Sequence, residues 1–201
     1  MIWIGLHGWG SSGDRFRQSW EEAGAPCPPD TIFLDGLEEE PLTGLRRWFP
    51  LTGPADRLSD SLDHALPVVE AAINRALAKR GARGEEIGLF GHSQGGMLAL
   101  AMVLRQRLRI VRAAAYAAYL PERYLERQRT GAPIASVVSL HSSRCDRFVR
   151  HSAVSATAQQ LRALGVAQVE HMVARDLAHE FNPAWLQATS YRSGFDARHA
   201  D

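Results

Sequence analysis

A short apolar strand, a tight turn and an apolar helix follow one another in the middle of the chain. Ile87–Phe90 has the length and composition of a buried strand, and Gln94–Gln106 continues directly as a helix. The turn between them reads Gly-His-Ser-Gln-Gly-Gly and is centred on Ser93. This G-x-S-x-G pattern between a strand and a helix predicts a strained serine flanked by residues that must be small. An incidental Gly/Ser turn is the alternative interpretation.

The rest of the chain alternates between apolar runs of strand length and amphipathic segments. Expected strands are Ile2–Leu6, Thr31–Leu34, Ile87–Phe90, Val111–Ala118, Ala135–Leu140 and Val166–Val173. Expected helices are Asp14–Ala23, Ser61–Arg80, Gln94–Gln106, Ser152–Leu164 and Pro183–Thr189. Most of the strands are continuous apolar runs, as in sheets covered on both faces. The alternation predicts a three-layer α/β fold with a mostly parallel sheet of about six strands.

Size and charge exclude several other classes of protein. The 201 residues are 45% hydrophobic and carry a net charge of +1, which suits one domain over residues 1–201 and argues against nucleic-acid binding. No apolar run approaches the ~20 residues that span a bilayer, so we expect no integral membrane association. Ile2–Leu6 follows no basic segment and is interpreted as a buried strand rather than a signal peptide. Cys27 and Cys145 are too few for a disulfide framework, and a cytoplasmic location is expected.

A serine nucleophile needs a histidine base and a carboxylate that orients it, normally in the chain order Ser, Asp or Glu, His. His179 alone follows the last predicted strand in a loop. The other histidines lie in turns near the serine, in predicted strands or helices, or in a polar tail: His7, His64, His92, His141, His151, His171 and His199. We therefore predict His179 as the base. Asp146, after the strand Ala135–Leu140, is favoured as the acid over Asp176, which lies three residues before His179.

The oxyanion of the transition state also needs hydrogen-bond donors. One expected donor is the backbone N–H after the nucleophile, that of Gln94. The second is assigned to the backbone N–H of Trp9, in the glycine-rich loop that follows the strand Ile2–Leu6. A phosphate-binding loop is the alternative, but this segment has neither the lysine of a P-loop nor the spacing of a dinucleotide fingerprint.

Two long connections, Gly36–Asp60 and Tyr119–Pro133, are expected near the carboxyl ends of the strands, where ligands bind in parallel sheets. Their apolar residues Trp48, Phe49, Tyr119 and Leu120 are predicted to bind an acyl chain. The alternative is that Trp48 and Phe49 anchor the long loop to the core. Arg46 and Arg47 could meet an anionic leaving group, although solvated arginines are commoner.

Several motifs together resemble the phospholipase/carboxylesterase family, which includes acyl-protein thioesterases. They are Leu6-His7-Gly8-Trp9-Gly10, Trp48-Phe49, Gly91-His92-Ser93-Gln94-Gly95-Gly96, Tyr119-Leu120-Pro121, Cys145-Asp146-Arg147-Phe148-Val149 and His179-Glu180-Phe181. The resemblance spans nearly the whole chain and implies an α/β-hydrolase fold with a Ser93–Asp146–His179 triad. Where the family has H-G-x-x-D before the acid, this chain reads His-Ser-Ser-Arg-Cys-Asp.

The expected substrate is a small-molecule ester or another acyl compound. The expected activity is hydrolysis of its ester or thioester bond through an acyl-enzyme intermediate. No cofactor is expected, and no metal-ligand spacing is present. A catalytically silent binding protein on the same scaffold is one alternative. A hydrolase or acyltransferase acting on an amide or lactone is another, because the same triad serves each reaction. The sequence makes no prediction of the oligomeric state.

Overall fold

The structure, a computed structural model, describes residues 1–22, 27–39, 41, 43–51, 55–129, 131 and 133–181. Its strands are β1 (Ile2–Leu6), β2 (Thr31–Leu34), β3 (Glu38–Glu39), β4 (Arg46–Arg47), β5 (Ile87–His92), β6 (Ile110–Tyr116), β7 (Ile134–Ser143) and β8 (Val166–Ala174). Its helices are α1 (Gly13–Glu22), α2 (Ala55–Lys79), α3 (Gln94–Arg105), α4 (Glu122–Glu126) and α5 (His151–Ala163). The helix expected at Pro183–Thr189 and the tail with His199 lie outside the described residues.

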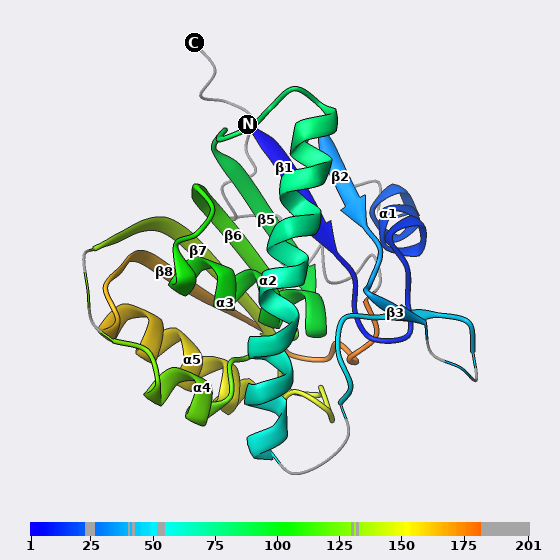
Figure 1. Cartoon of the computed structure of the whole chain (residues 1–201). Coiled ribbons are helices and arrows are strands. Elements are labelled where there is room, and N and C mark those ends of the chain that lie inside the picture. Colours follow the sequence, from blue (N-terminus) through cyan, green and yellow to red (C-terminus); the bar gives the residue numbers. More distant parts are fainter. Residues whose placement is uncertain are drawn as a thin grey trace.

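The main sheet has six strands in the order β2-β1-β5-β6-β7-β8, and every neighbouring pair is parallel (Figure 1). The predicted α/β fold with about six mostly parallel strands is therefore confirmed. Because all the strands run the same way, the loops after β1, β5, β7 and β8 leave the sheet at one edge. The segments that carry Trp9, Ser93, Asp146 and His179 are these loops.

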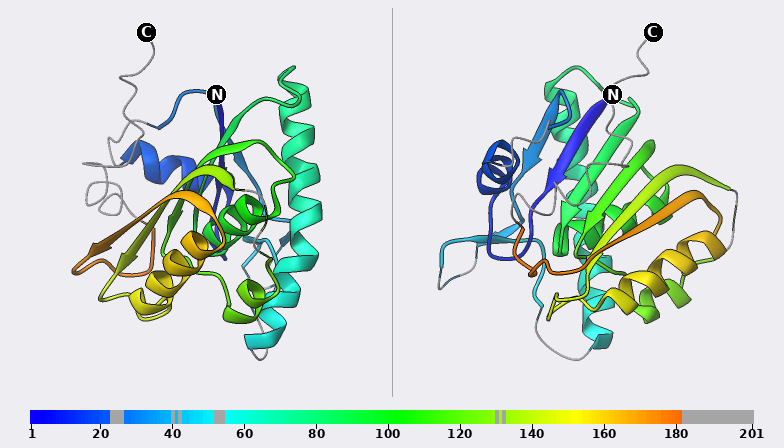
Figure 2. Two further views of the ribbon diagram at one scale, coloured as in Figure 1. Left: turned by 90° about the vertical axis from the view of Figure 1, so that its left-hand side faces the viewer. Right: turned by 180° about the vertical axis from the view of Figure 1, so that it is seen from behind.

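Helices cover both faces of this sheet (Figure 2). Among the described helices, α1 lies alone on one face, against β1 and β2. The other face carries α3 and α5, with α2 packed on α3 and α4 beside α2. A smaller core under α1 joins aromatic side chains from helix and strands, among them Trp3, Phe16, Trp20, Phe90 and Tyr116. The sheet is thus the middle of three layers, as expected.

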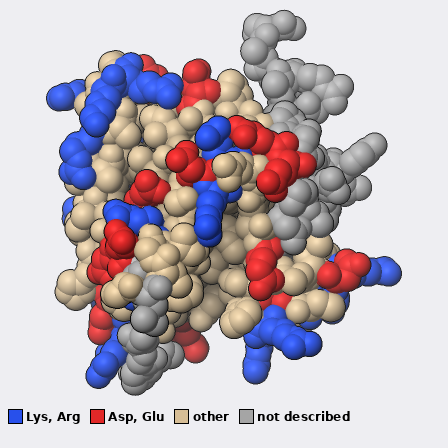
Figure 3. Space-filling view, turned by 90° about the vertical axis from the view of Figure 1, so that its right-hand side faces the viewer, with Lys and Arg blue, Asp and Glu red and all other residues tan. Residues whose placement is uncertain are grey.

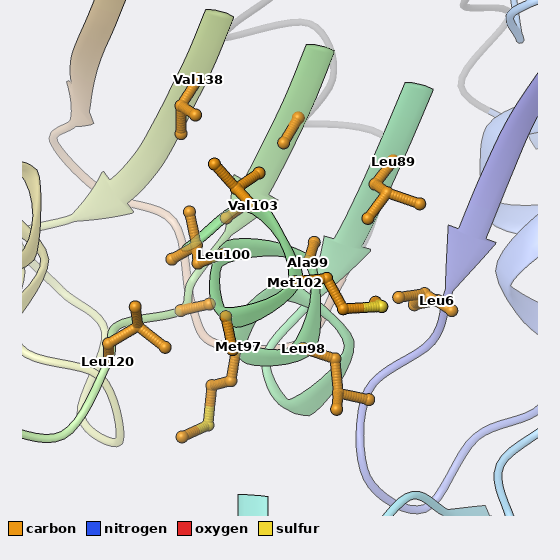
Figure 4. Close-up of a cluster of buried hydrophobic side chains, with 14 of the residues drawn as sticks. Leu6, Leu89, Met97, Leu98, Ala99, Leu100, Met102, Val103, Leu120 and Val138 are labelled. Atoms are coloured by element: carbon orange, nitrogen blue, oxygen red, sulfur yellow. The ribbon is translucent and has the colours of Figure 1, made fainter. Parts of the chain in front are cut away.

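α3 is the central helix of the larger core. Its residues from Gln94 to Val103 are all buried, since β1, β5, β6 and β7 all contact it. In Figure 4, Leu100 and Val103 lie toward Val138 of β7, whereas Met102 lies beside Leu6 of β1. A helix held on this many sides fixes the turn at its N-terminus, where Ser93 lies.

Two small elements lie within connections that we expected to be long loops. In Gly36–Asp60, β3 pairs antiparallel with β4, and the ladder opposes acidic and basic side chains, with Arg47 Nε 2.9 Å from Glu38 Oε2 and Arg46 Nη1 3.7 Å from Glu39 Oε2. In Tyr119–Pro133, the short helix α4 follows Pro121 and buries Tyr124 and Leu125. Both elements are too short to show a periodic pattern in the sequence.

The surface mixes charges of both signs. Figure 3 shows acidic and basic side chains interspersed on the face that carries α1 and β3. Within the described ranges, no helix has the length and apolar character needed to cross a membrane.

Replacing Gly95 by alanine should destabilise the fold, because its Cβ would overlap the backbone carbonyl of Leu6 in β1. We expect Gly95→Ala to lower the free energy of unfolding by about 3 kcal/mol in urea titrations. Gly131→Ala is the matched control, since a Cβ there would meet nothing within 4 Å, and it should change stability by less than about 0.5 kcal/mol. Equal stabilities of the two variants would contradict this account.

Candidate active site

The turn between β5 and α3 holds Ser93 in a strained conformation. Its φ of 50° and ψ of −116° lie in a region that residues with a Cβ rarely occupy. A Cβ on Gly91 would overlap the backbone of Gly95, and one on Gly96 would lie 2.5 Å from the Cβ of Ala118. The strained turn and its need for small residues, both expected from the sequence, are confirmed.

The side chains of Ser93, His179 and Asp146 form a hydrogen-bonded chain. His179 Nδ1 lies 2.9 Å from Asp146 Oδ2, and His179 Nε2 lies 3.1 Å from Ser93 Oγ. A carboxylate can only accept, so the proton of a neutral His179 is on Nδ1 and Nε2 accepts from the serine hydroxyl. Three loops that follow different strands bring these groups together.

Asp146 is held as a carboxylate. Its Oδ1 accepts the backbone N–H groups of Phe148 and Val149, both at 2.9 Å. Burial by itself raises the pKa of Asp146, but the hydrogen bonds from His179 and from these two N–H groups outweigh it, and the pKa lies below its usual value. Asp176, the alternative acid, is exposed. The structure therefore brings Asp146, rather than Asp176, to His179.

The glycine-rich loop after β1 lies against the serine turn. A Cβ on Gly8 would be 2.6 Å from His92 Nδ1 and 3.5 Å from the Cβ of Ser93. Trp9 comes next, with 47% of its surface exposed, and Gly10 donates its N–H to the carbonyl of Arg46 at 3.0 Å. On the other side, Gln94 is the first residue of α3, and the first N–H groups of a helix have no partner within it. Of the two predicted oxyanion donors, Gln94 thus follows Ser93 in the chain, and Trp9 follows Gly8, which lies against Ser93.

The four predicted substrate-binding residues lie mainly in the interior. Trp48, Phe49 and Leu120 are buried in the larger core. Tyr119 is half-buried and lines a groove of about 430 Å³ between α4 and α5. The burial of Trp48 and Phe49 fits the alternative in which they anchor the long loop. For all four residues a substrate contact stays only a prediction.

The side chain of Gln94 explains how that loop is anchored. Its Oε1 accepts the backbone N–H of Trp48 at 3.1 Å, and its Nε2 donates to the carbonyl of Phe49 at 2.6 Å. The indole N–H of Trp48 donates to the carbonyl of His7 at 2.8 Å. From the sequence, only a backbone role is expected for Gln94, because a buried glutamine that pairs with a distant backbone segment leaves no local pattern.

Two histidines that were set aside as bases have structural contacts instead. His7 is buried, and its Nε2 accepts the backbone N–H of Gly36 at 2.8 Å. His92 Nε2 lies 2.7 Å from the backbone carbonyl oxygen of His179. In the sequence, only its position next to Ser93 marks His92 as a residue of interest. The hydrogen-bond partner of its ring cannot be inferred from the sequence. Among the residues described, no group of three or more His, Cys, Asp or Glu side chains could hold a metal ion.

The parallel sheet and the strained serine between β5 and α3 define the class of α/β-hydrolases. The model of the Phospholipase/Carboxylesterase family matches residues 2–191. The chain therefore belongs to this family, as its motifs suggested, and the family indicates a hydrolase of the carboxylesterase or thioesterase type. No curated protein matches the chain.

Solved structures show the same fold at low sequence identity. Esterase PE8 is 23% identical with a TM-score of 0.73, over 92% of this chain and 87% of its own. Acyl-protein thioesterase 2 from Zea mays is 20% identical with a TM-score of 0.72, over 92% and 89%. A carboxylesterase from Mesorhizobium loti is 16% identical with a TM-score of 0.75, over 94% and 87%.

The stability of the protein should fall as the pH drops from about 6.5 toward 3. Burial, reinforced by His179 near His92 and by His171 near His141, lowers the pKa of His92 and of His141 from 6.5 to about 3. The unfolded chain binds protons through this range and the folded chain does not. Each histidine should therefore lower the free energy of unfolding at pH 5 by about 2 kcal/mol relative to its value well above pH 6.5.

His141→Phe tests this pH dependence, since a phenyl ring can keep the stacking on Tyr116, whose ring centroid is 4.4 Å from that of His141. We expect urea unfolding at a series of pH values to show a loss of stability between pH 6.5 and pH 5 that is ~1–2 kcal/mol smaller than in wild type. The rest of the loss should remain, because burial also lowers the pKa values of His7, His92 and His171. A variant as acid-sensitive as wild type would show that His141 is not kept neutral by the fold.

Proposed function

We propose that the chain is a serine hydrolase that cleaves carboxylic esters or thioesters through a triad of Ser93, His179 and Asp146. The observation that carries this proposal is the hydrogen-bonded chain from Ser93 Oγ through the imidazole to the Asp146 carboxylate. This is the geometry in which a weak hydroxyl nucleophile is activated by a neighbouring base. Membership of the phospholipase/carboxylesterase family supports it.

Acylation begins at Ser93. As its oxygen attacks the carbonyl carbon of the substrate, the hydroxyl proton passes to His179 Nε2, which already lies 3.1 Å away. The imidazolium that forms is stabilised by Asp146, which accepts the Nδ1 proton as a hydrogen bond without taking it. The tetrahedral intermediate collapses when His179 returns the proton to the leaving oxygen or sulfur.

The negative charge of the tetrahedral intermediate is assigned to two backbone donors, the N–H groups of Gln94 and Trp9. The N-terminus of α3 adds a favourable dipole at the same point. Losing one donor of this kind typically costs about 3 kcal/mol of transition-state stabilisation. In the second half of the reaction, His179 removes a proton from water, which attacks the acyl-enzyme and regenerates Ser93.

Apolar side chains at the site favour an apolar acyl group. Trp9 is 47% exposed and Phe148 is 75% exposed, and the ring centroid of Phe148 is 5.2 Å from that of His179. Exposed aromatic groups beside a reacting centre suit hydrophobic ligands. Tyr119, half-buried at the groove between α4 and α5, is proposed as a further substrate contact. Arg46 and Arg47 pair with glutamates, which argues against a leaving-group contact for them.

The proposed partner is therefore a small ester or acyl thioester, and the proposed location is the cytoplasm, which the free thiols of Cys27 and Cys145 support.

The nucleophile is tested with a fluorophosphonate probe and with aryl esters and thioesters graded by acyl length. We expect wild type to be labelled and to hydrolyse at least part of the panel. Ser93→Ala should lose the labelling and on the order of 10³-fold or more in kcat, because the acyl-enzyme can no longer form. A folded wild type that is neither labelled nor active would instead indicate a silent binding protein.

The acid is tested by a matched pair of substitutions. Asp146→Asn should lower kcat by ~10²-fold or more, since an amide at this position no longer favours the Nδ1–H tautomer or stabilises the imidazolium. Asp176→Asn is the control and should leave kcat near wild type, because Asp176 is exposed. The opposite result, with Asp176→Asn inactive and Asp146→Asn active, would reassign the orienting carboxylate.

A further inference from the structure

His92 reaches from the serine turn to the loop that carries the base. It directly precedes Ser93, yet its Nε2 lies 2.7 Å from the backbone carbonyl oxygen of His179. The ring centroid of His92 is 5.1 Å from that of His179 and 5.3 Å from that of Phe181. The two histidines therefore meet at two points, through a hydrogen bond to backbone and through their rings.

The contact with a carbonyl oxygen determines which ring nitrogen of His92 carries the proton. A carbonyl oxygen can only accept, so Nε2 of His92 must carry the hydrogen. His92 is buried, and burial, with the nearby His179, holds its pKa at about 3, so the ring is neutral at pH 7. A neutral neighbour matters here, because a charged one would oppose the imidazolium that His179 becomes during acylation.

The surroundings leave His92 little freedom. A Cβ on Gly8 would lie 2.6 Å from its Nδ1, so the loop after β1 closes one side of the ring, and Phe181 packs close by. The base loop, residues 175–181, belongs to no helix or strand. Its backbone has no ladder or helical hydrogen-bond pattern to fix it, so its position depends on individual contacts such as this one.

We propose that His92 is a positioning residue for the base: its Nε2–H, donated to the carbonyl of His179, sets the place of the imidazole relative to Ser93. The inference rests on the proposed role of His179. Two hydrogen bonds then connect the serine turn to the base. One joins Ser93 Oγ and His179 Nε2, and the other runs from the ring of His92 to the backbone carbonyl of His179. A displacement of about 1 Å in such a geometry can cost ~10²-fold in rate.

The test compares His92→Gln with His92→Met. The two side chains have nearly the same length and shape, but only glutamine keeps an N–H donor near the position of Nε2. We expect His92→Met to lower kcat for an aryl ester by ~10-fold or more while KM changes less than ~2-fold, because positioning and not binding is lost. His92→Gln should recover kcat to within ~3-fold of wild type.

A spectroscopic readout separates positioning from general stability. The Nδ1 proton of His179, hydrogen bonded to Asp146, should give a downfield proton resonance, which its loss in His179→Gln would assign. It should stay sharp in wild type and His92→Gln and be broadened or lost in His92→Met. Thermal unfolding of each variant shows that the comparison is made on folded protein, and His92→Leu replaces His92→Met if the latter does not fold.

Wild-type kcat and an unchanged resonance in a folded His92→Met would overturn the proposal. Equal losses in the glutamine and methionine variants would also overturn it, because the donor would then not matter. A wild type that hydrolyses no ester and takes no fluorophosphonate would overturn the proposed function instead. The resonance comparison does not need activity, so it would still test the contact between His92 and His179.

Discussion

The close approach of the serine turn to β1 is the constraint on which the rest of the site depends. Gly95, in the first turn of α3, lies directly on the carbonyl of Leu6, so that any side chain there would overlap it. This contact lets the N-terminus of α3 sit beside the end of β1, and it places the loop with Gly8 against His92 and Ser93. The strain at Ser93 persists because packing on several sides of α3 holds it.

Around that turn, buried polar side chains form hydrogen bonds with loop backbone groups that have no partner in a helix or strand. Gln94 satisfies a backbone N–H and a carbonyl of the loop before α2, and His7 accepts from the backbone at Gly36. Each of these groups would be costly to bury alone, and each finds its partner in another loop. The loops at this edge of the sheet are consequently joined to one another through side chains of the serine turn and the strand ends.

Local patterns were enough to predict the six parallel strands, the helices that cover them and the turn at Ser93. The chain order also sufficed to propose His179 and Asp146, which the structure brings within 2.9 Å of each other. What could not be predicted rests on elements too short to show a period and on pairing between distant residues. The β3–β4 ladder, α4 and the contact from His92 to a carbonyl 87 positions away have no local period, and the burial of Trp48 reflects a partner, Gln94, in another element.

Phe148, in the loop after β7, has one role for its backbone and another for its side chain. The backbone N–H of Phe148 helps to hold Asp146, whereas its side chain is 75% exposed beside His179. Every amino acid except proline can supply that N–H. Position 148 can therefore change in size or polarity during evolution while Asp146 keeps its backbone hydrogen-bond donors. The surface beside His179 can vary in this way without disturbing the carboxylate.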